Sequence, residues 1–137
     1  MELIFDKEYA TIHYEQENNL MYLELIGNIA TEQYKETFNT LTDMGADAKI
    51  KYLLVNQATM KNSSMEAKAW LITTWLPRTR KIFNDEVKTA ILVSKNIFTK
   101  LGAEYVVAAV RKFTNFDMRT FVDQETARKW LFEDTKI

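Results

Sequence analysis

Hydrophobic and polar residues alternate near the start of the chain in the way expected of two paired strands. In YATIHYEQ, residues 9–16, apolar and polar side chains take turns, which is the period of a half-buried strand. The run LMYLELIG, residues 20–27, predicts a second strand, which we expect to end at Gly27 and Asn28. Polar residues 17–19 separate the two runs, and because asparagine tolerates a left-handed turn, we predict a hairpin.

Two shorter apolar runs, IKYLLV at residues 50–55 and TAILV at residues 89–93, show no alternation. Continuous runs of strand-forming residues are typical of central strands that are covered on both faces. The run MRTFV at residues 118–122 predicts one more strand near the end of the chain.

Apolar residues at helical spacing predict helices between these strands. Thr31 is placed to cap the first helix, which we expect to end near Gly45. Residues 97–113, IFTKLGAEYVVAAVRKF, have one apolar and one charged face, which predicts an amphipathic helix. Asp123 is expected to cap the last helix.

The segment NSSMEAKAWLITTWLPRTRK, residues 62–81, predicts a helix that a proline disturbs. Ser63 and Glu66 have the spacing of a capping box, in which each side chain satisfies the other residue's backbone N–H. Because Pro77 cannot donate a backbone hydrogen bond, we expect a kink or a restart there. Trp70 falls outside the apolar stripe that we expect to cover the sheet. The stripe consists of Met65, Ala69, Ile72 and Leu76, with Leu71 and Trp75 beside it.

The order of elements, β-β-α-β-α-β-α-β-α, predicts an α/β fold. Strands that alternate with helices pair in parallel through right-handed crossovers, whereas the first two strands form an antiparallel hairpin. We therefore expect a mixed sheet of four or five strands with about four helices, in a single domain over residues 1–137.

Composition narrows the classes of function. With 47% hydrophobic and 27% charged residues, a chain of 137 residues can form one core. A net charge of −1 gives no broad positive field, so we expect no nucleic-acid partner. The absence of cysteine excludes disulfides and thiol catalysis. No run of about 18 apolar residues predicts a membrane span, and the acidic first residues do not resemble a secretory signal, so we predict a cytoplasmic protein.

Motifs for catalysis, metal binding and nucleotide binding are not found in the sequence. His13 is the only histidine, and it lies on the polar side of the first predicted strand without an evident partner for acid–base or metal chemistry. We therefore expect a solvated histidine. There is no glycine-rich phosphate loop and no nucleophile elbow. We predict no catalytic residues, no metal site and no cofactor.

Two serines in the segment 62–81 are candidate phosphoacceptors. Ser63 and Ser64 lie where the free N–H groups and the dipole of a helix N-terminus would hold a phosphate. Serine is also a common N-cap residue, so capping alone explains their presence as well.

Basic and aromatic residues in the same segment are candidates for an interaction surface. Arg78, Arg80 and Lys81 either hold an anionic group or an acidic partner, or they form a solvated helix end. Trp70 either contacts a partner, as tryptophan often does in interfaces, or is covered by another part of the fold.

Four stretches of the chain, taken in order, resemble the STAS family, and more closely its SpoIIAA-like branch of small stand-alone bacterial proteins. They are LMYLELIGNIATEQYKETFNTL, IKYLLVNQATM, KTAILVS and FVDQETARKWL, and together they span nearly the whole chain. The resemblance implies a four- or five-stranded sheet with helices and a non-enzymatic regulatory or ligand-binding role. The branch also resembles lipid-carrier domains in fold, which implies an apolar ligand between helices as an alternative.

In the anti-sigma antagonists of this family, a serine that follows an aspartate just after the central strand is phosphorylated to switch partner binding. Here Asn56 follows the predicted strand, no Asp-Ser pair is present, and Ser63 and Ser64 come later.

We therefore expect an interaction module that binds a protein partner through the surface around Ser63, Trp70 and residues 78–81. The alternative is a carrier or sensor of a small apolar, lipid-like or anionic ligand held between helices, with Arg78 or Arg80 pairing to its charge. An enzyme is the least supported class.

Overall fold

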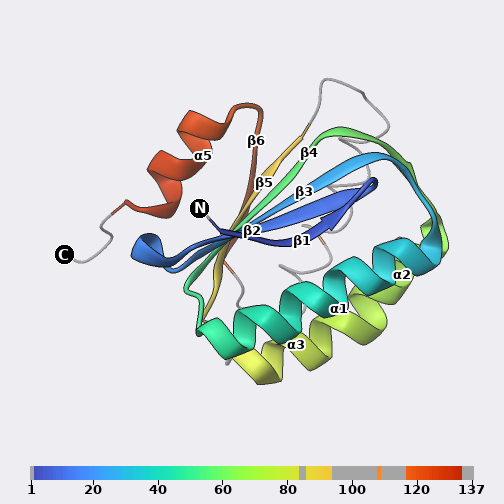
Figure 1. Ribbon diagram of the computed structural model, residues 1–137, viewed down its shortest axis with the longest axis horizontal. Coiled ribbons are helices and arrows are strands. Elements are labelled where there is room, and N and C mark those ends of the chain that lie inside the picture. Colours follow the sequence, from blue (N-terminus) through green and yellow to red (C-terminus); the bar gives the residue numbers. More distant parts are fainter. Residues whose placement is uncertain (1, 84–85, 94–107, 109–116, 134–137) are drawn as a thin grey trace.

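A mixed sheet forms the centre of the described part of the chain, which is residues 2–83, 86–93, 108 and 117–133 of a computed structural model (Figure 1). These residues form a six-stranded sheet in the order β1-β2-β3-β4-β5-β6. The first three strands pair antiparallel, and β3 to β6 pair parallel. The strands are β1 (Glu2–Lys7), β2 (Ala10–Glu15), β3 (Leu20–Ile29), β4 (Tyr52–Ser63), β5 (Lys88–Leu92) and β6 (Met118–Phe121). The predicted fold class is confirmed, with six strands rather than four or five.

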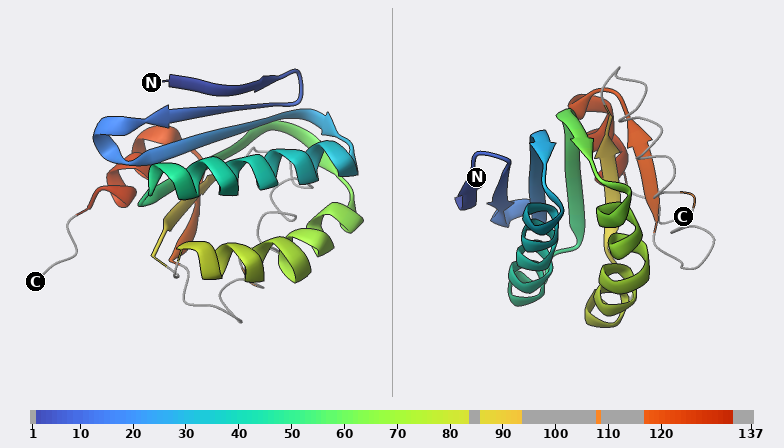
Figure 2. Two further views of the ribbon diagram at one scale, coloured as in Figure 1. Left: turned by 60° about the horizontal axis from the view of Figure 1, so that its bottom comes forward. Right: turned by 90° about the vertical axis from the view of Figure 1, so that its right-hand side faces the viewer.

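Helices cover both faces of this sheet (Figures 1 and 2). They are α1 (Thr31–Ala48), α2 (Met65–Trp70), α3 (Leu76–Phe83) and α5 (Gln124–Leu131). The larger core, which includes Leu23, Phe38 and Trp75, lies between the sheet and the layer formed by α1, α2 and α3. A smaller core, which includes Leu54 and Leu131, lies beneath α5 on the opposite face.

β1 is the strand that the sequence analysis did not predict. A register shift between Leu3 and Phe5 interrupts its pairing with β2, so its side chains do not alternate in a regular way. In the turn that follows, the hydroxyl of Tyr9 donates to the carboxylate of Glu36 on α1. This hydrogen bond is the main reason why the pKa of Tyr9 rises to about 12. This contact joins the turn between β1 and β2 to α1.

Both the hairpin and the start of α5 follow the prediction. Asn19, between β2 and β3, takes the left-handed conformation with φ of 53°. Asp123 caps α5 by accepting a hydrogen bond from the N–H of Thr126 at 2.8 Å. The predicted end of the second strand is wrong, because β3 continues to Ile29. Gly27 allows this by taking φ of +65° beside a register shift against β4.

The ends of α1 lie away from the predicted residues. Ala30, and not Thr31, is the N-cap residue. The helix passes Gly45 and ends at Ala48, because Lys49 takes the left-handed conformation with φ of 55°. Gly45 serves packing instead, since a Cβ atom there would lie 3.0 Å from Cζ of Phe83 at the end of α3.

One predicted element cannot be compared with the structure. The amphipathic helix expected at residues 97–113 lies outside the described residues, apart from residue 108. In the described ranges, none of the helices combines the length and the apolar character that a membrane crossing requires.

Candidate functional site

The helix that carries the candidate residues begins directly after β4. Ser63 is the last residue of β4, where it pairs with Ile29 of β3 and is only 5% exposed. Ser64 is the N-cap residue of α2, and its Oγ accepts a hydrogen bond from the N–H of Ala67 at 3.0 Å. The predicted capping box that starts at Ser63 is therefore wrong by one residue. Strand pairing holds Ser63 in the sheet and leaves the capping position to Ser64.

The start of α1 lies near the start of α2 (Figure 1), and the two candidate phosphoacceptors directly precede α2. Oγ of Ser64 lies 2.7 Å from Oγ1 of Thr31, the first residue of α1. Nζ of Lys68 donates to Oγ of Ser63 at 3.0 Å and to the carbonyl oxygen of Ser63 at 2.9 Å. Burial lowers the pKa of Lys68. Three hydroxyl groups and one amine therefore gather at the N-terminal ends of α1 and α2.

The capping role of Ser64 leads to a prediction for stability. Ser64→Ala should lower the free energy of unfolding by about 1 kcal/mol, because the N–H of Ala67 loses its acceptor. Ser64→Asp keeps a good capping side chain and should stay within about 0.5 kcal/mol of the wild type. Urea unfolding of the three proteins measures both differences. Equal stability of Ser64→Ala and the wild type would contradict the assignment of the cap.

Between α2 and α3 the helix widens into a π-helical turn, Leu71–Trp75, which we call the π turn. It closes with a hydrogen bond from the N–H of Leu76 to the carbonyl oxygen of Leu71. Pro77 then lies in the first turn of α3, where a missing N–H is tolerated. The α-helix does restart near Pro77, as predicted, but a wider turn joins the two parts.

The face of this helix that packs on the sheet differs from the predicted stripe. Of the four stripe residues only Leu76 is buried, while Met65 is 65% exposed. Leu71 and Trp75, which were predicted beside the stripe, are buried as expected. Side chains that recur every four residues stay on one face only where the helix has more than 3.6 residues per turn. The π turn, with its larger number of residues per turn, meets this condition. The buried residues are Ala67, Leu71, Trp75, Leu76 and Thr79.

The opposite face of the same helix is exposed. We call it the outer ridge, and it consists of Met65, Ala69, Thr73, Pro77 and Lys81, which are all exposed and recur every four residues. Only Lys81 carries a charge. The outer ridge is therefore a mostly uncharged line of side chains on the surface of the protein.

Trp70 and Arg78 face α1. Nζ of Lys35 on α1 lies 6.0 Å from the ring centre of Trp70, which is half-buried and packs against the larger core. Arg78 donates to Oδ1 of Asn39 and to Oδ1 of Asp43, each at 2.8 Å. These contacts fix both side chains in the seam between the two helices.

The structure does not gather the three basic candidates into one cluster. Arg78 pairs with α1, and Lys81 belongs to the outer ridge. Arg80 is half-buried and lies two residues from Arg78, so the two do not share a face of the helix.

His13 is not the solvated histidine that we expected. It is half-buried in β2, and its ring centre lies 6.1 Å from that of Tyr22. Its Nδ1 is buried and has no hydrogen-bond partner within the described part of the chain. The described residues hold no group of histidine, aspartate and glutamate side chains suited to a metal ion.

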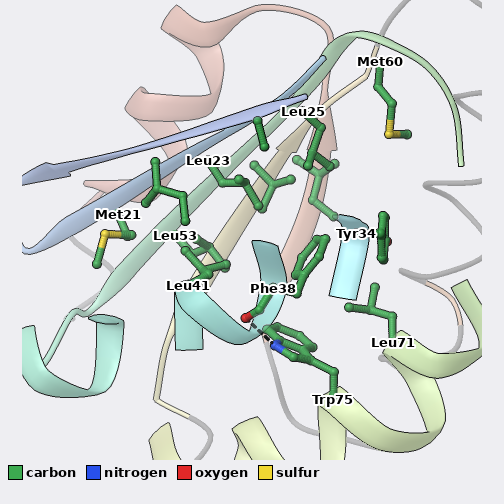
Figure 3. Close-up of a cluster of buried hydrophobic side chains, with 14 of the residues drawn as sticks. Met21, Leu23, Leu25, Tyr34, Phe38, Leu41, Leu53, Met60, Leu71 and Trp75 are labelled. Atoms are coloured by element: carbon green, nitrogen blue, oxygen red, sulfur yellow. Dashed lines mark hydrogen bonds between the residues drawn. The ribbon is translucent and has the colours of Figure 1, made fainter. Parts of the chain in front are cut away.

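A cavity of about 40 Å³ lies beneath the π turn, and sequence reasoning did not anticipate it. Phe38, Leu71 and Trp75 form part of its wall (Figure 3). Gln57 of β4 also lines the cavity, is 8% exposed, and has a buried Oε1 that no described residue meets with a hydrogen bond. The prediction placed residue 57 after the end of its strand, so no signal marked this side chain as buried.

Comparison with known proteins places this arrangement in a family. A search of curated proteins gave no significant match. An uncharacterised protein of the DUF3478 family from Shewanella loihica PV-4, with a SpoIIAA-like fold, is 20% identical with a TM-score of 0.62, covering 93% of this chain and 98% of its own. The unphosphorylated anti-sigma factor antagonist SpoIIAA is 15% identical with a TM-score of 0.45, covering 91% and 90%.

The structural similarity to the Shewanella protein supports the fold, and the sequence match supports the family. The family model described as SpoIIAA-like matches residues 20–132. This range includes the strands β3 to β6 and the helices α1, α2, α3 and α5. The protein therefore belongs to the SpoIIAA-like family.

Proposed function

We propose that the protein is a non-enzymatic regulatory module that binds a protein partner through the outer ridge and the flanking Trp70 and Arg78. The observation that carries this proposal is that four of the five exposed ridge residues are uncharged, with Met65 at 65% exposure. A line of apolar side chains along one helix face is a common means of docking into a partner's groove. Membership of the SpoIIAA-like family supports a regulatory role.

Trp70 and Arg78 are suited to stand at the edge of such an interface. Tryptophan and arginine are the side-chain types most often found to dominate binding energy. Contacts with Lys35, Asn39 and Asp43 on α1 already hold them in place. A pre-ordered side chain loses less entropy when a partner binds, so these contacts favour affinity.

Ser64 is the residue at which we propose that the interaction is regulated. It directly precedes Met65 at the start of the outer ridge and is half-buried, whereas Ser63 is 5% exposed. A phosphate on Ser64 would be stabilised by the helix N-terminus and would place about two negative charges beside the uncharged ridge. Such a change would weaken an apolar contact and strengthen a contact with a basic partner.

The non-enzymatic part of the proposal rests on the surroundings of the polar groups. The contact between Ser63 and Lys68 resembles a nucleophile–base pair, but Ser63 is buried and the amine also donates to a backbone carbonyl. That geometry suits stabilisation of the end of β4 better than it suits proton transfer. The cytoplasmic location predicted from the sequence stays a prediction.

Negative charge introduced on the outer ridge tests the proposal. Immobilised wild type should capture a reproducible partner from a lysate of the host, identified by mass spectrometry. Ala69→Glu and Lys81→Glu should each reduce capture by at least about tenfold, because both positions are exposed and lie in the proposed contact. Lys129→Glu, at an exposed position of α5, is the matched control and should capture normally.

Trp70 itself is left unchanged in this test, because it packs against the core and its truncation would also lower stability. Circular dichroism establishes that each variant is folded. If both ridge variants retain the partner of the wild type, the ridge is not the binding surface.

A further inference from the structure

The cavity beneath the π turn has the features of a ligand site that is separate from the outer ridge. We propose that it binds a small neutral molecule with an apolar body and one N–H or O–H donor, which bonds to Oε1 of Gln57. This inference goes beyond the proposed interaction function and does not depend on it.

Gln57 is the polar anchor of the site. It follows Leu53 and Val55 at every second position of β4, so its side chain points to the face of the sheet that α1, α2 and α3 cover. Its Oε1 is buried and has no hydrogen-bond partner among the described residues. A buried polar atom without a partner carries a substantial desolvation cost, and a ligand donor would offset it. An apolar side chain at this position would avoid the cost altogether.

The rest of the wall determines the polarity of the ligand. Phe38, Val55, Leu71 and Trp75 present apolar surface. Thr89 adds a hydroxyl group, and among the described residues no charged side chain lines the cavity. Nε1 of Trp75 already donates to the carbonyl oxygen of Phe38 at 2.9 Å, so this donor is used within the protein. An apolar wall with an acceptor at Gln57 favours an uncharged ligand that brings the donor itself.

The anionic ligand considered from the sequence does not fit this cavity. Arg78 and Arg80 are absent from its wall, so neither can pair with a charge inside it. Arg78 instead pairs with Asp43 on α1.

The size of the cavity restricts the ligand further. A volume of about 40 Å³ is room for about three water-sized spheres. Pockets for drug-sized ligands measure about 300–1,000 Å³, so a lipid chain would require a rearrangement of the wall. A compact five-membered ring requires a much smaller movement of the wall than a lipid chain does. The π turn forms the helical side of this wall, and π-helical turns occur often at functional sites.

Pyrrole and furan provide a direct test because the two rings have nearly the same shape, and only pyrrole has an N–H donor. Titration of the ¹⁵N-labelled protein should shift the indole N–H resonance of Trp75, which lies in the cavity wall. Pyrrole should bind the wild type about three to ten times more tightly than furan, as expected for one hydrogen bond. Gln57→Met should bind both rings equally, because it keeps the approximate volume and loses the acceptor.

Two further variants serve as controls. Gln16→Met makes the same exchange at an exposed position and should keep the preference for pyrrole. Leu71→Phe adds volume to the cavity wall and should weaken both rings at least about tenfold. If Gln57→Met does not fold, the pyrrole preference of the wild type and the weaker binding of both rings by Leu71→Phe decide the question.

Three results would overturn the proposal. They are equal binding of pyrrole and furan by the wild type, a preference that survives in Gln57→Met, and no shift of Trp75 with either ring. The last result would mean that internal water or another part of the chain satisfies Gln57.

Discussion

Trp75→Ala is expected to lower the free energy of unfolding by about 3–5 kcal/mol, the largest effect that we predict for any single substitution. The side chain is 7% exposed and packs edge-on against Phe38, with ring centres 5.3 Å apart. Its Nε1 also donates to the carbonyl oxygen of Phe38 on α1 (Figure 3). Truncation removes the apolar contact, enlarges the cavity beneath the π turn and separates the turn from α1. Urea unfolding followed by circular dichroism measures the loss.

Two variants separate the causes of that effect. Trp75→Phe keeps a ring and loses the donor, so it should cost less than alanine, at least about 1 kcal/mol for the lost hydrogen bond. Trp130→Ala removes a half-buried tryptophan from α5, on the other face of the sheet, and should cost less than Trp75→Ala. If Trp75→Ala is no more damaging than Trp130→Ala, the π turn does not anchor the helical layer as described.

Arg128→Met is expected to lower the free energy of unfolding at pH 7 by about 2–3 kcal/mol. Arg128 donates to both carboxylate oxygens of Glu15, at 3.2 and 3.0 Å, and so ties α5 to β2. The Glu15 side chain is only 11% exposed, and removal of its partner leaves a carboxylate that is poorly hydrated. The pair is partly exposed at Arg128, which keeps the effect below that of a fully buried pair.

The same pair predicts how stability depends on pH. The pKa of Glu15 is lowered, first by the hydrogen bond from Arg128 and also by the side chain of Asn18. A lowered pKa in the folded state means that the stabilisation is complete above the ordinary value of the carboxyl, 4.5, and is lost as the pH falls through the folded value. The gap between wild type and Arg128→Met should therefore be widest at neutral pH and shrink below about pH 4.

Urea unfolding between pH 7 and pH 3 measures this gap. Lys129→Met, at an exposed neighbouring position, should track the wild type throughout. A gap that stays constant over the whole range would show that Arg128 acts through packing and not through its charge.

Local sequence is sufficient for the elements whose ends depend on nearby residues. The turn at Asn19 and the cap at Asp123 follow from the conformational preferences of single side chains, and both are present. The run at residues 89–93 also predicts β5 at nearly its observed bounds, because a short continuous apolar run is typical of a buried strand.

Contacts between distant residues explain the elements that differ. Ser63 and Ser64 are both good capping residues, and only the pairing of Ser63 with Ile29 assigns the cap to Ser64. β4 was predicted to stop at Val55, but its pairing with the extended β3 carries it to Ser63. That extension brings Gln57 into the sheet and beneath the helical layer.

The π turn accounts for the main difference in the candidate site. Ala67, Leu71, Trp75 and Thr79 recur every four residues, which a regular α-helix would spread over its surface. The sequence therefore fits more than one buried stripe until the π turn is known. Once it is known, the predicted core residues Met65 and Ala69 become part of the exposed outer ridge.

Hydrogen exchange on the purified complex with the captured partner tests the central claim, that the outer ridge is the binding surface, most directly. The account predicts slower exchange of the backbone amides in α2, the π turn and α3 when the partner is bound, with α5 unchanged. Protection confined to α5 or to the β1–β2 hairpin, with α2 and α3 exchanging as in the free protein, would contradict it.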